Sequence, residues 1–209
     1  MNLRDGVHSY DLDWDFDEPL GVHVLETGEA TVLFGAGSEG AGDRVADIAA
    51  EHDVDAVVVE HGDGDHYGGV PALRAASDDL EVAVPAGDAA FLEDAGIAVD
   101  RPLEAGETVW GIETVPTPGH TPDNMAYRHE DVLVAGDTVV GADSLFAAAG
   151  DWSGALAPCT PDYNDDDQQT RESIPALGWY DVDVVLLSHG ENVTAGGSGE
   201  IERLVADLA

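Results

Sequence analysis

The chain has 209 residues, of which 44 are acidic and 7 are arginine, with no lysine, so its formal net charge at pH 7 is −37. Such a charge argues against nucleic-acid and anionic-membrane partners, because both need a basic footprint, although in molar salt a local patch would act independently of the net charge. The acidic residues are spread through apolar periodic segments instead of forming a tail, which favours a folded protein adapted to molar salt, where the Debye length falls to about 3 Å.

Apolar periodicity predicts strands and helices that alternate through both halves of the chain. After an acidic leader, the first half is expected to contain a β-hairpin over 21–37, a helix over 41–53, a strand over 55–60, a helix near 69–77, a strand over 81–85 and a short helix over 88–96. The second half is expected to contain strands over 107–117, 124–131 and 132–140, an irregular stretch over 142–169, a helix near 168–179, a strand over 181–190 and a helix over 200–209. This alternation argues for a layered α/β or α+β architecture, placed in one domain over residues 1–209.

Histidines and aspartates gather where the predicted strands end. The segment VVVEHGDGDHYGG, residues 57–69, begins with a β-branched run. Histidines and aspartates follow, separated by glycines. Glycine lets the backbone turn tightly and bring several side chains toward one point. Further residues of the same two kinds follow later strand-like runs. The complete set is His61, Asp63, Asp65, His66, His120, Asp137 and His189.

Metal binding explains this set better than structure alone. Buried carboxylates are costly unless they are paired or bind a cation. The chain has no lysine, and no arginine lies within seven residues of Asp63, Asp65 or Asp137 in the sequence, so a pair of divalent metal ions is the expected source of positive charge. The other four histidines are expected to make ordinary hydrogen bonds in the core or at the surface: His8, His23, His52 and His129.

The order of these motifs resembles that of the metallo-β-lactamase fold superfamily of metallohydrolases. That family carries His-x-His-x-Asp-His followed by Gly-Gly, then a histidine in a Gly-His-Thr-Pro-like turn, an aspartate in a Gly-Asp-Thr-like turn and a late histidine. This chain has HGDGDHYGG from His61, TPGHTPDN around His120, AGDTVV around Asp137 and LSHG around His189, in the same order. The four motifs together are specific, whereas each alone would be weak. The resemblance runs from about residue 20 to the C-terminus.

The resemblance implies a four-layer αββα sandwich of the metallo-β-lactamase type, with two metal ions at one edge where strand ends and loops meet. The implied ligands fall into two sets that share one aspartate: His61, Asp63 and His120 for one ion, Asp65, His66 and His189 for the other, and Asp137 as the bridge.

Two positions depart from the family's pattern. Residue 63 is aspartate where the common pattern has histidine, which resembles the carboxylate of the flavodiiron branch. Zinc is the expected metal, but an oxygen ligand also shifts preference toward iron or manganese. Gly35 stands where family members usually carry an aspartate that supports the metal loop from behind, and Glu60 is the neighbour that would compensate.

A binuclear site of this kind predicts a metal-dependent hydrolase. A hydroxide that bridges the two ions would attack the substrate, while Asp65 orients it and shuttles a proton. The expected substrate is an ester, a thioester or a lactone, because the motifs resemble those of small members of the glyoxalase II kind. Three alternatives stay open: a phosphodiesterase or nuclease of the same superfamily, a flavodiiron-like oxidoreductase that needs a separate electron donor, and a non-catalytic metal-stabilised binding protein.

The remaining features concern compartment and specificity. Cys159 is the only cysteine, so no internal disulfide can form, which agrees with a reducing cytoplasm. The N-terminus lacks an apolar signal region, and no run approaches the roughly 18 apolar residues of a spanning helix. We therefore expect a soluble protein of a high-salt cytosol with a small-molecule substrate and no membrane partner. The irregular stretch 142–169 is the expected source of substrate specificity.

Overall fold

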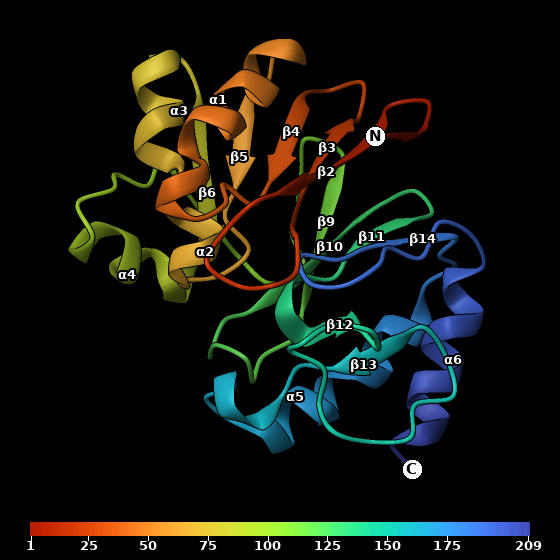
Figure 1. Cartoon of the computed structure of the whole chain (residues 1–209). Helices are drawn as coiled ribbons and strands as arrows, with labels where there is room; N and C mark the ends of the chain where they lie inside the picture. Colours follow the sequence, from red (N-terminus) through yellow and green to blue (C-terminus); the bar gives the residue numbers. More distant parts are fainter.

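The computed structural model describes residues 1–209, and two β-sheets lie face to face in it (Figure 1). The first sheet has seven strands, which are neighbours in the sheet in the same order as along the chain. They are β1 (Asn2–Arg4), β2 (Val7–Leu12), β3 (Leu20–Glu26), β4 (Thr31–Phe34), β5 (Ala56–Val58), β6 (Glu81–Pro85) and β7 (Arg101–Leu103). The first four strands pair antiparallel, and β4 to β7 run parallel.

The second sheet has five strands, and a small two-stranded sheet lies beside it. The five are β8 (Thr108–Val109), β9 (Ile112–Pro116), β10 (Met125–His129), β11 (Val132–Val134) and β14 (Val184–Leu186), in the spatial order β14-β11-β10-β9-β8. Only β11 and β14 are parallel. The small sheet pairs β12 (Val139–Gly141) with β13 (Leu156–Pro158).

Helices cover the outer faces of both sheets. The first sheet is covered by α1 (Gly42–Glu51), α3 (Val70–Ala76) and α4 (Ala89–Asp94), whose buried residues share one core with its strands. The second is covered by α6 (Gly197–Asp207) and by a 3₁₀ helix (Ile174–Trp179) that continues α5 (Asp167–Ser173). In Figure 1, α1 and α3 lie on one side of the molecule, and α5 and α6 lie on the other.

The strands read as continuous apolar runs because both of their faces are buried. In β5 and just after it, Val57 and Val59 pack toward the helices of the first layer, whereas Val58 packs between the sheets. In β14, Val184 and Leu186 face the first sheet, and Val185 faces the outer helices. Successive side chains of a strand point to opposite faces, so each of these strands contributes side chains to two hydrophobic cores. This arrangement confirms the four-layer αββα architecture.

Most predicted elements are present, but the acidic leader is not an isolated segment. Residues 2–12 form β1 and β2, and β2 pairs with β3 through six residue pairs. Val7, Ser9 and Leu12 are buried, while the intervening Asp11 is exposed. Because the buried Ser9 is polar and Asp11 is exposed, the apolar residues of this strand do not alternate regularly along the sequence.

Four predictions in the rest of the chain need correction. The run 132–140 is not one strand, because a 3₁₀ turn (Gly136–Thr138) separates β11 from β12 as the chain leaves the large sheet. The run 107–117 is a hairpin of β8 and β9 that turns at Trp110 and Gly111, both of which have positive φ. The stretch 142–169 contains β13, and the predicted helix at 168–179 becomes 3₁₀ near Pro175, which has no amide donor.

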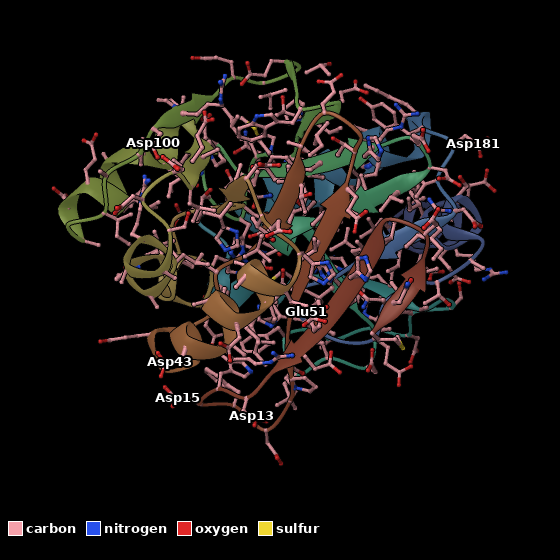
Figure 2. The ribbon with its side chains drawn as sticks, turned by 90° about the horizontal axis from the view of Figure 1, so that it is seen from above. Asp13, Asp15, Asp43, Glu51, Asp100 and Asp181 are labelled. Atoms are coloured by element: carbon pink, nitrogen blue, oxygen red, sulfur yellow. The ribbon has the colours of Figure 1, made fainter.

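Acidic side chains are exposed on α1 and in several loops. Figure 2 labels Asp13, Asp15, Asp43, Glu51 and others, all of them exposed. No helix of the structure is both long enough and apolar enough to cross a bilayer.

His23 is fully buried and connects the two sheets. Its Nε2–H donates to the backbone carbonyl of Leu187 at 3.1 Å, and its Nδ1 accepts from the Ser9 hydroxyl at 3.1 Å. Burial, offset in part by the charge of Glu60, lowers the pKa of His23 to about 4. This histidine is therefore neutral in the folded protein at neutral pH.

Acid is expected to weaken the fold through His23. The unfolded chain binds a proton at this ring below about pH 6.5, whereas the folded chain does so only below about pH 4. The free energy of unfolding should therefore fall by up to about 3 kcal/mol as the pH drops through that window, with no such loss above it. Urea unfolding of the wild type and His23→Gln at a series of pH values measures the effect. The variant should lose less stability in acid, and parallel curves would contradict the expectation.

Candidate metal centre

The predicted histidines and aspartates meet at one edge of the sandwich, although they come from distant parts of the chain. They are delivered by the segment after β5 (His61, Asp63), by α2 (Gly64–Tyr67; Asp65, His66), by the β9–β10 loop (His120), by the 3₁₀ turn between β11 and β12 (Asp137) and by the segment after β14 (His189). The segment predicted as a charged loop thus includes one helical turn, in which the amide of Gly68 donates to the carbonyl of Gly64 at 3.0 Å.

His61, Asp63 and His120 form a compact triad. The Nε2 atoms of the two histidines are 3.2 Å apart, and Oδ2 of Asp63 lies 3.5 Å from the first and 3.2 Å from the second. Ligands of one tetrahedral zinc ion, with bonds of about 2.0–2.2 Å, are separated by roughly 3.3–3.6 Å. The three atoms therefore have the spacing of three ligands on one ion.

A second triad lies beside the first, and Asp137 is shared between them. Oδ2 of Asp65 lies 3.4 Å from Nε2 of His189 and 3.8 Å from Nε2 of His66. The Asp137 carboxylate lies 3.2 Å from Nε2 of His189, 3.5 Å from Nε2 of His66 and 3.7 Å from Nε2 of His120. One carboxylate thus reaches both triads, which is the geometry of a bridge.

Oxygen acceptors orient the imidazoles from outside the site. His120 Nδ1–H donates to Oδ1 of Asn164 at 3.2 Å, and Nδ1 of His189 lies 3.5 Å from Oε1 of Glu18. A proton on Nδ1 leaves the lone pair on Nε2, the atom that faces the other side chains of the site. The hydrogen bond to Asn164 therefore favours the tautomer of His120 whose Nε2 can bind a metal ion, and Glu18 lies where it would favour the same tautomer of His189 once that ring is neutral.

The electrostatics of the cluster call for positive charge. Burial by itself would raise the pKa of the Asp137 carboxyl, but His189 and His66 hold it well below its usual range. Burial lowers the pKa of His189, yet Asp137 more than compensates and raises that pKa to about 11. Hydrogen bonds from His120 and His61 hold the pKa of the Asp63 carboxyl far below its usual value. The carboxylates of Asp137 and Asp63 are thus ionised. Their negative charge would stabilise a cation bound between them, either a protonated imidazole or a metal ion.

Divalent ions fit this donor set. Nε2 of His66 and Oδ1 of Asp137 are both buried, face each other at 3.5 Å and have no hydrogen-bond partner. An unpaired buried polar atom is costly, and a cation coordinated by both atoms would remove that cost. The assignment of the seven side chains as ligands stays a prediction, and the distances among them support it.

Glu60 occupies the space beside Gly35, where the resemblance led us to expect an aspartate. The Glu60 side chain is fully buried, and its Oε2 accepts from Nδ1–H of His66 at 3.0 Å. A Cβ atom built on Gly35 would lie 3.5 Å and 3.6 Å from the two Glu60 carboxylate oxygens. A carboxylate therefore lies behind the candidate metal-binding loop, but it comes from the segment just after β5 instead of from position 35.

A cavity of about 350 Å³ opens onto both triads. Asp63, Asp65, His120, Asp137 and His189 line it together with eight further residues, none of which is arginine or lysine. Its aromatic side chains are Trp14, Phe16, Phe146 and Tyr163. The ring of Phe146 lies 4.5 Å from the ring of His189, so the aromatic wall adjoins the candidate metal ligands directly.

The contribution of the β2–β3 loop to the cavity was not predicted from the sequence. Trp14, Phe16 and Glu18 all lie within the acidic leader, and only the alternation of aromatic and acidic residues there could have marked it. By contrast, the irregular stretch 142–169 was expected to supply specificity, and it provides Phe146 and Tyr163 to the cavity.

Sequence comparisons identify relatives over parts of the chain. Lactamase-like protein aptB of Emericella nidulans is 32% identical over 132 residues, which cover 57% of this chain and 40% of that protein. Uncharacterized protein YobT of Bacillus subtilis is 27% identical over 103 residues, which cover 39% of this chain and 44% of that protein. The matched region thus spans less than half the length of these curated relatives.

Solved structures share the fold at low sequence identity. The metallo-beta-lactamase from Pontibacter korlensis superposes with a TM-score of 0.72 at 19% identity, covering 100% of this chain and 97% of that one. The metallo-beta-lactamase FIM-1 from Pseudomonas aeruginosa, in its mono-zinc form, gives a TM-score of 0.73 at 17% identity, covering 98% and 92%. The family model described as the metallo-beta-lactamase superfamily matches residues 22–189. That match spans more than half of the sequence, and the chain belongs to the metallo-beta-lactamase superfamily.

Proposed function

We propose that this protein is a binuclear metal-dependent hydrolase that acts on a small, uncharged ester, thioester or lactone. The observation that carries the proposal is the pair of triads that share Asp137 beneath an aromatic-walled cavity. A ligand set with four imidazoles and three carboxylates suits two divalent ions, of which zinc is the first candidate.

The side chains of the site are proposed to have two roles, metal binding and proton transfer. Two divalent ions held here would supply Lewis acidity and a hydroxide nucleophile at neutral pH. Asp65 lines the cavity, and the charge of His66 and a hydrogen bond from His189 outweigh burial and lower its pKa, so its carboxylate is ionised and can accept a proton from the substrate side. Asp63 is half-exposed and faces the same cavity. Asp65 is therefore proposed as a ligand and as the proton acceptor.

The cavity lining supports an uncharged substrate with an apolar part. Phe146 and Tyr163 have ring centroids 5.2 Å apart, and Trp14 and Phe16 have theirs 4.6 Å apart, which forms a wall suited to an alkyl or aryl group. A phosphodiester would bring negative charge into a cavity lined by Asp15, Asp63 and Asp65, where the metal ions would be the only cations because no arginine or lysine lines it. The same argument disfavours the carboxylate of a β-lactam, the substrate class named for the structural neighbours.

Hydrolysis of probe substrates with and without chelator tests the proposal. Protein loaded with zinc in molar salt should hydrolyse ester, thioester or lactone probes, lose that activity in chelator and regain it when zinc is restored. Asp65→Asn should reduce turnover more strongly than metal content. Metal-loaded protein that turns over none of these probes would contradict the proposal and favour a metal-stabilised binding protein, and preferred turnover of a phosphodiester would favour the nuclease alternative.

Asp63 favours one further candidate. An oxygen donor at this position is harder than imidazole and suits iron or manganese, which would allow a di-iron oxidoreductase served by a separate electron donor. Metal analysis of protein purified without chelator and without added metal distinguishes the two. Zinc as the dominant metal supports the hydrolase, whereas about two irons per chain support the redox alternative.

Phe16 is expected to contribute to selectivity for the apolar part of the substrate. Its side chain lines the cavity yet is 45% exposed, so its removal should leave the fold intact. Phe16→Ala should raise KM for an aryl or long-chain ester about tenfold, with little change for an acetyl ester, because part of an aromatic contact area is lost. Trp179→Ala is the matched control, since Trp179 is 82% exposed and lies outside the cavity. Equal effects of Phe16→Ala on both esters would remove this residue from the substrate site.

We further propose that the fold depends on high salt. The net charge of −37 repels itself strongly when the Debye length is about 10 Å, at 0.1 M salt, and much less when it is about 3 Å, at 1 M salt. The midpoint of thermal unfolding should therefore rise steadily between these concentrations. A midpoint that is constant over this range would contradict adaptation to salt.

A further inference from the structure

A second cluster of potential ligands lies at the opposite end of the first sheet from the candidate metal centre. β3 begins at Leu20, which forms a bridge with His189, and it ends at Glu26. With a rise of about 3.3 Å per residue, the two ends of this strand are roughly 20 Å apart. The cluster at the far end consists of His8, Glu26 and His52, and its nearest donor atoms all lie within 4.8 Å of one another.

The sheet register brings the first two side chains together. His8 on β2 is paired with Val24 on β3, so Glu26 is its diagonal neighbour, two residues farther along β3 on the same face. Nε2 of His8 lies 3.3 Å from Oε1 of Glu26. The side chain of His8 is only 14% exposed, whereas that of Glu26 is 51% exposed and reaches the cluster from its open side.

His52 completes the cluster from a different layer. It is the residue that follows α1, and its Nδ1 lies 3.9 Å from the same Oε1 of Glu26. Its other ring nitrogen, Nε2, lies 2.5 Å from the hydroxyl of Tyr10, and the ring of Tyr10 is covered by the guanidinium of Arg44 at 5.5 Å. A histidine whose outer N–H is held by an oxygen has its inner nitrogen free for a metal ion.

The two imidazoles have a spacing like that found in the candidate metal centre. The ring centroids of His8 and His52 are 4.3 Å apart, compared with 4.5 Å for His61 and His120. Both histidines make the ordinary hydrogen bonds predicted from the sequence, His8 with Glu26 and His52 with Tyr10. Their convergence on one carboxylate oxygen also provides two nitrogen donors and one oxygen donor, a combination that suits zinc when water completes the coordination.

We propose that His8, Glu26 and His52 form a separate binding site for zinc. An ion bound there would connect the C-terminal end of α1 to strands β2 and β3. The C-terminal end of a helix carries partial negative charge, so a cation there is favoured further. An ion bound only by the folded chain stabilises that chain, and the stabilisation grows with the concentration of the ion. The site serves the fold and does not contribute to the cavity at the opposite end of β3.

Zinc stoichiometry tests this site. The full chain is stripped with chelator in molar salt, equilibrated with zinc at a series of free concentrations and analysed for bound zinc per chain. The double variant His8→Ala/His52→Ala should bind about one ion fewer than the wild type, whatever number the other centre holds. Its rate of hydrolysis should be unchanged. His129→Ala is the control, since His129 donates to the carbonyl of Gly111 at 2.9 Å and lies outside both clusters.

Two further variants cover the case in which the double variant does not fold. Glu26→Gln alters an exposed side chain and should weaken zinc binding at this site at least tenfold, and Tyr10→Phe should weaken it by about 10–100-fold through loss of the hydrogen bond to His52. An anomalous-scattering peak among the three side chains in zinc-soaked crystals would locate the ion. Equal zinc binding by the wild type and the folded variants would overturn the proposal.

Discussion

Replacing Asp137 with asparagine is expected to remove metal from both triads at once. Its carboxylate is buried and lies within 3.7 Å of imidazoles in both sets, so neutralising it weakens the binding of two cations instead of one. Removing one partner of a buried charge pair costs about 3–5 kcal/mol, which corresponds to a loss of roughly 10²–10⁴-fold in affinity. Metal content after dialysis and ester hydrolysis should fall together, and competition with a chelator measures the affinity.

Asp151→Asn serves as the matched control for this variant. Asp151 is exposed and lies outside the cavity, so the same chemical change there should leave metal content and turnover unaltered. A folded Asp137→Asn protein that holds as much metal as the wild type would show that this aspartate does not bridge the two triads, and the binuclear proposal would then lose its main support.

Glu60→Ala is expected to have the second-largest effect. This carboxylate is fully buried and accepts the Nδ1–H of His66, so its loss leaves a buried imidazole donor unpaired and the ring free to rotate. Loss of such an orienting group lowers metal affinity by about 10–100-fold, and loss of a charge-assisted hydrogen bond costs about 1.5–3 kcal/mol of stability. Chelator competition and urea unfolding measure the two effects separately.

A double-mutant cycle with Gly35→Asp tests why Glu60 is needed. The single change Gly35→Asp should be harmful, because its carboxylate would lie against that of Glu60 in a buried space. In the Glu60→Ala background the same aspartate enters the vacated space beside His66, and aspartate tolerates the φ of 74° at this position better than most residues. The double variant should therefore recover at least about 1 kcal/mol relative to the sum of the single changes. Strict additivity would mean that the two positions do not share one supporting role.

Local sequence was sufficient to predict the layers but not every strand. β5 and β14 were recognisable because both faces of these strands are buried, which produces uninterrupted apolar runs. β2 was not recognisable, since its buried positions, Val7, Ser9 and Leu12, do not alternate regularly and one of them is polar. β13, with three residues, is too short to carry a period, and it exists because β12 lies beside it.

The histidines and aspartates of the candidate site could be named from the sequence. The residues that surround them could not. Histidine and aspartate beside glycine at strand ends are visible in any local window, so His61 and His189 could be named from the sequence. Glu18 and Asn164 could not, because each acquires its role only by lying next to a histidine more than forty residues away in the chain. The aromatic wall depends on the same kind of long-range contact.

The sequence by itself determined the donor types, their order along the chain, the alternation of strands and helices, and the excess of negative charge. These are properties of composition and of short-range periodicity. The periodicity of apolar residues reflects which side of each element is buried. Only the tertiary structure decided that six candidate donors form two triads on either side of Asp137, that Glu60 fills the space beside Gly35, and that His8 and His52 converge on Glu26. Such contacts depend on how sheets and helices pack against one another, and no local stretch of sequence records that packing.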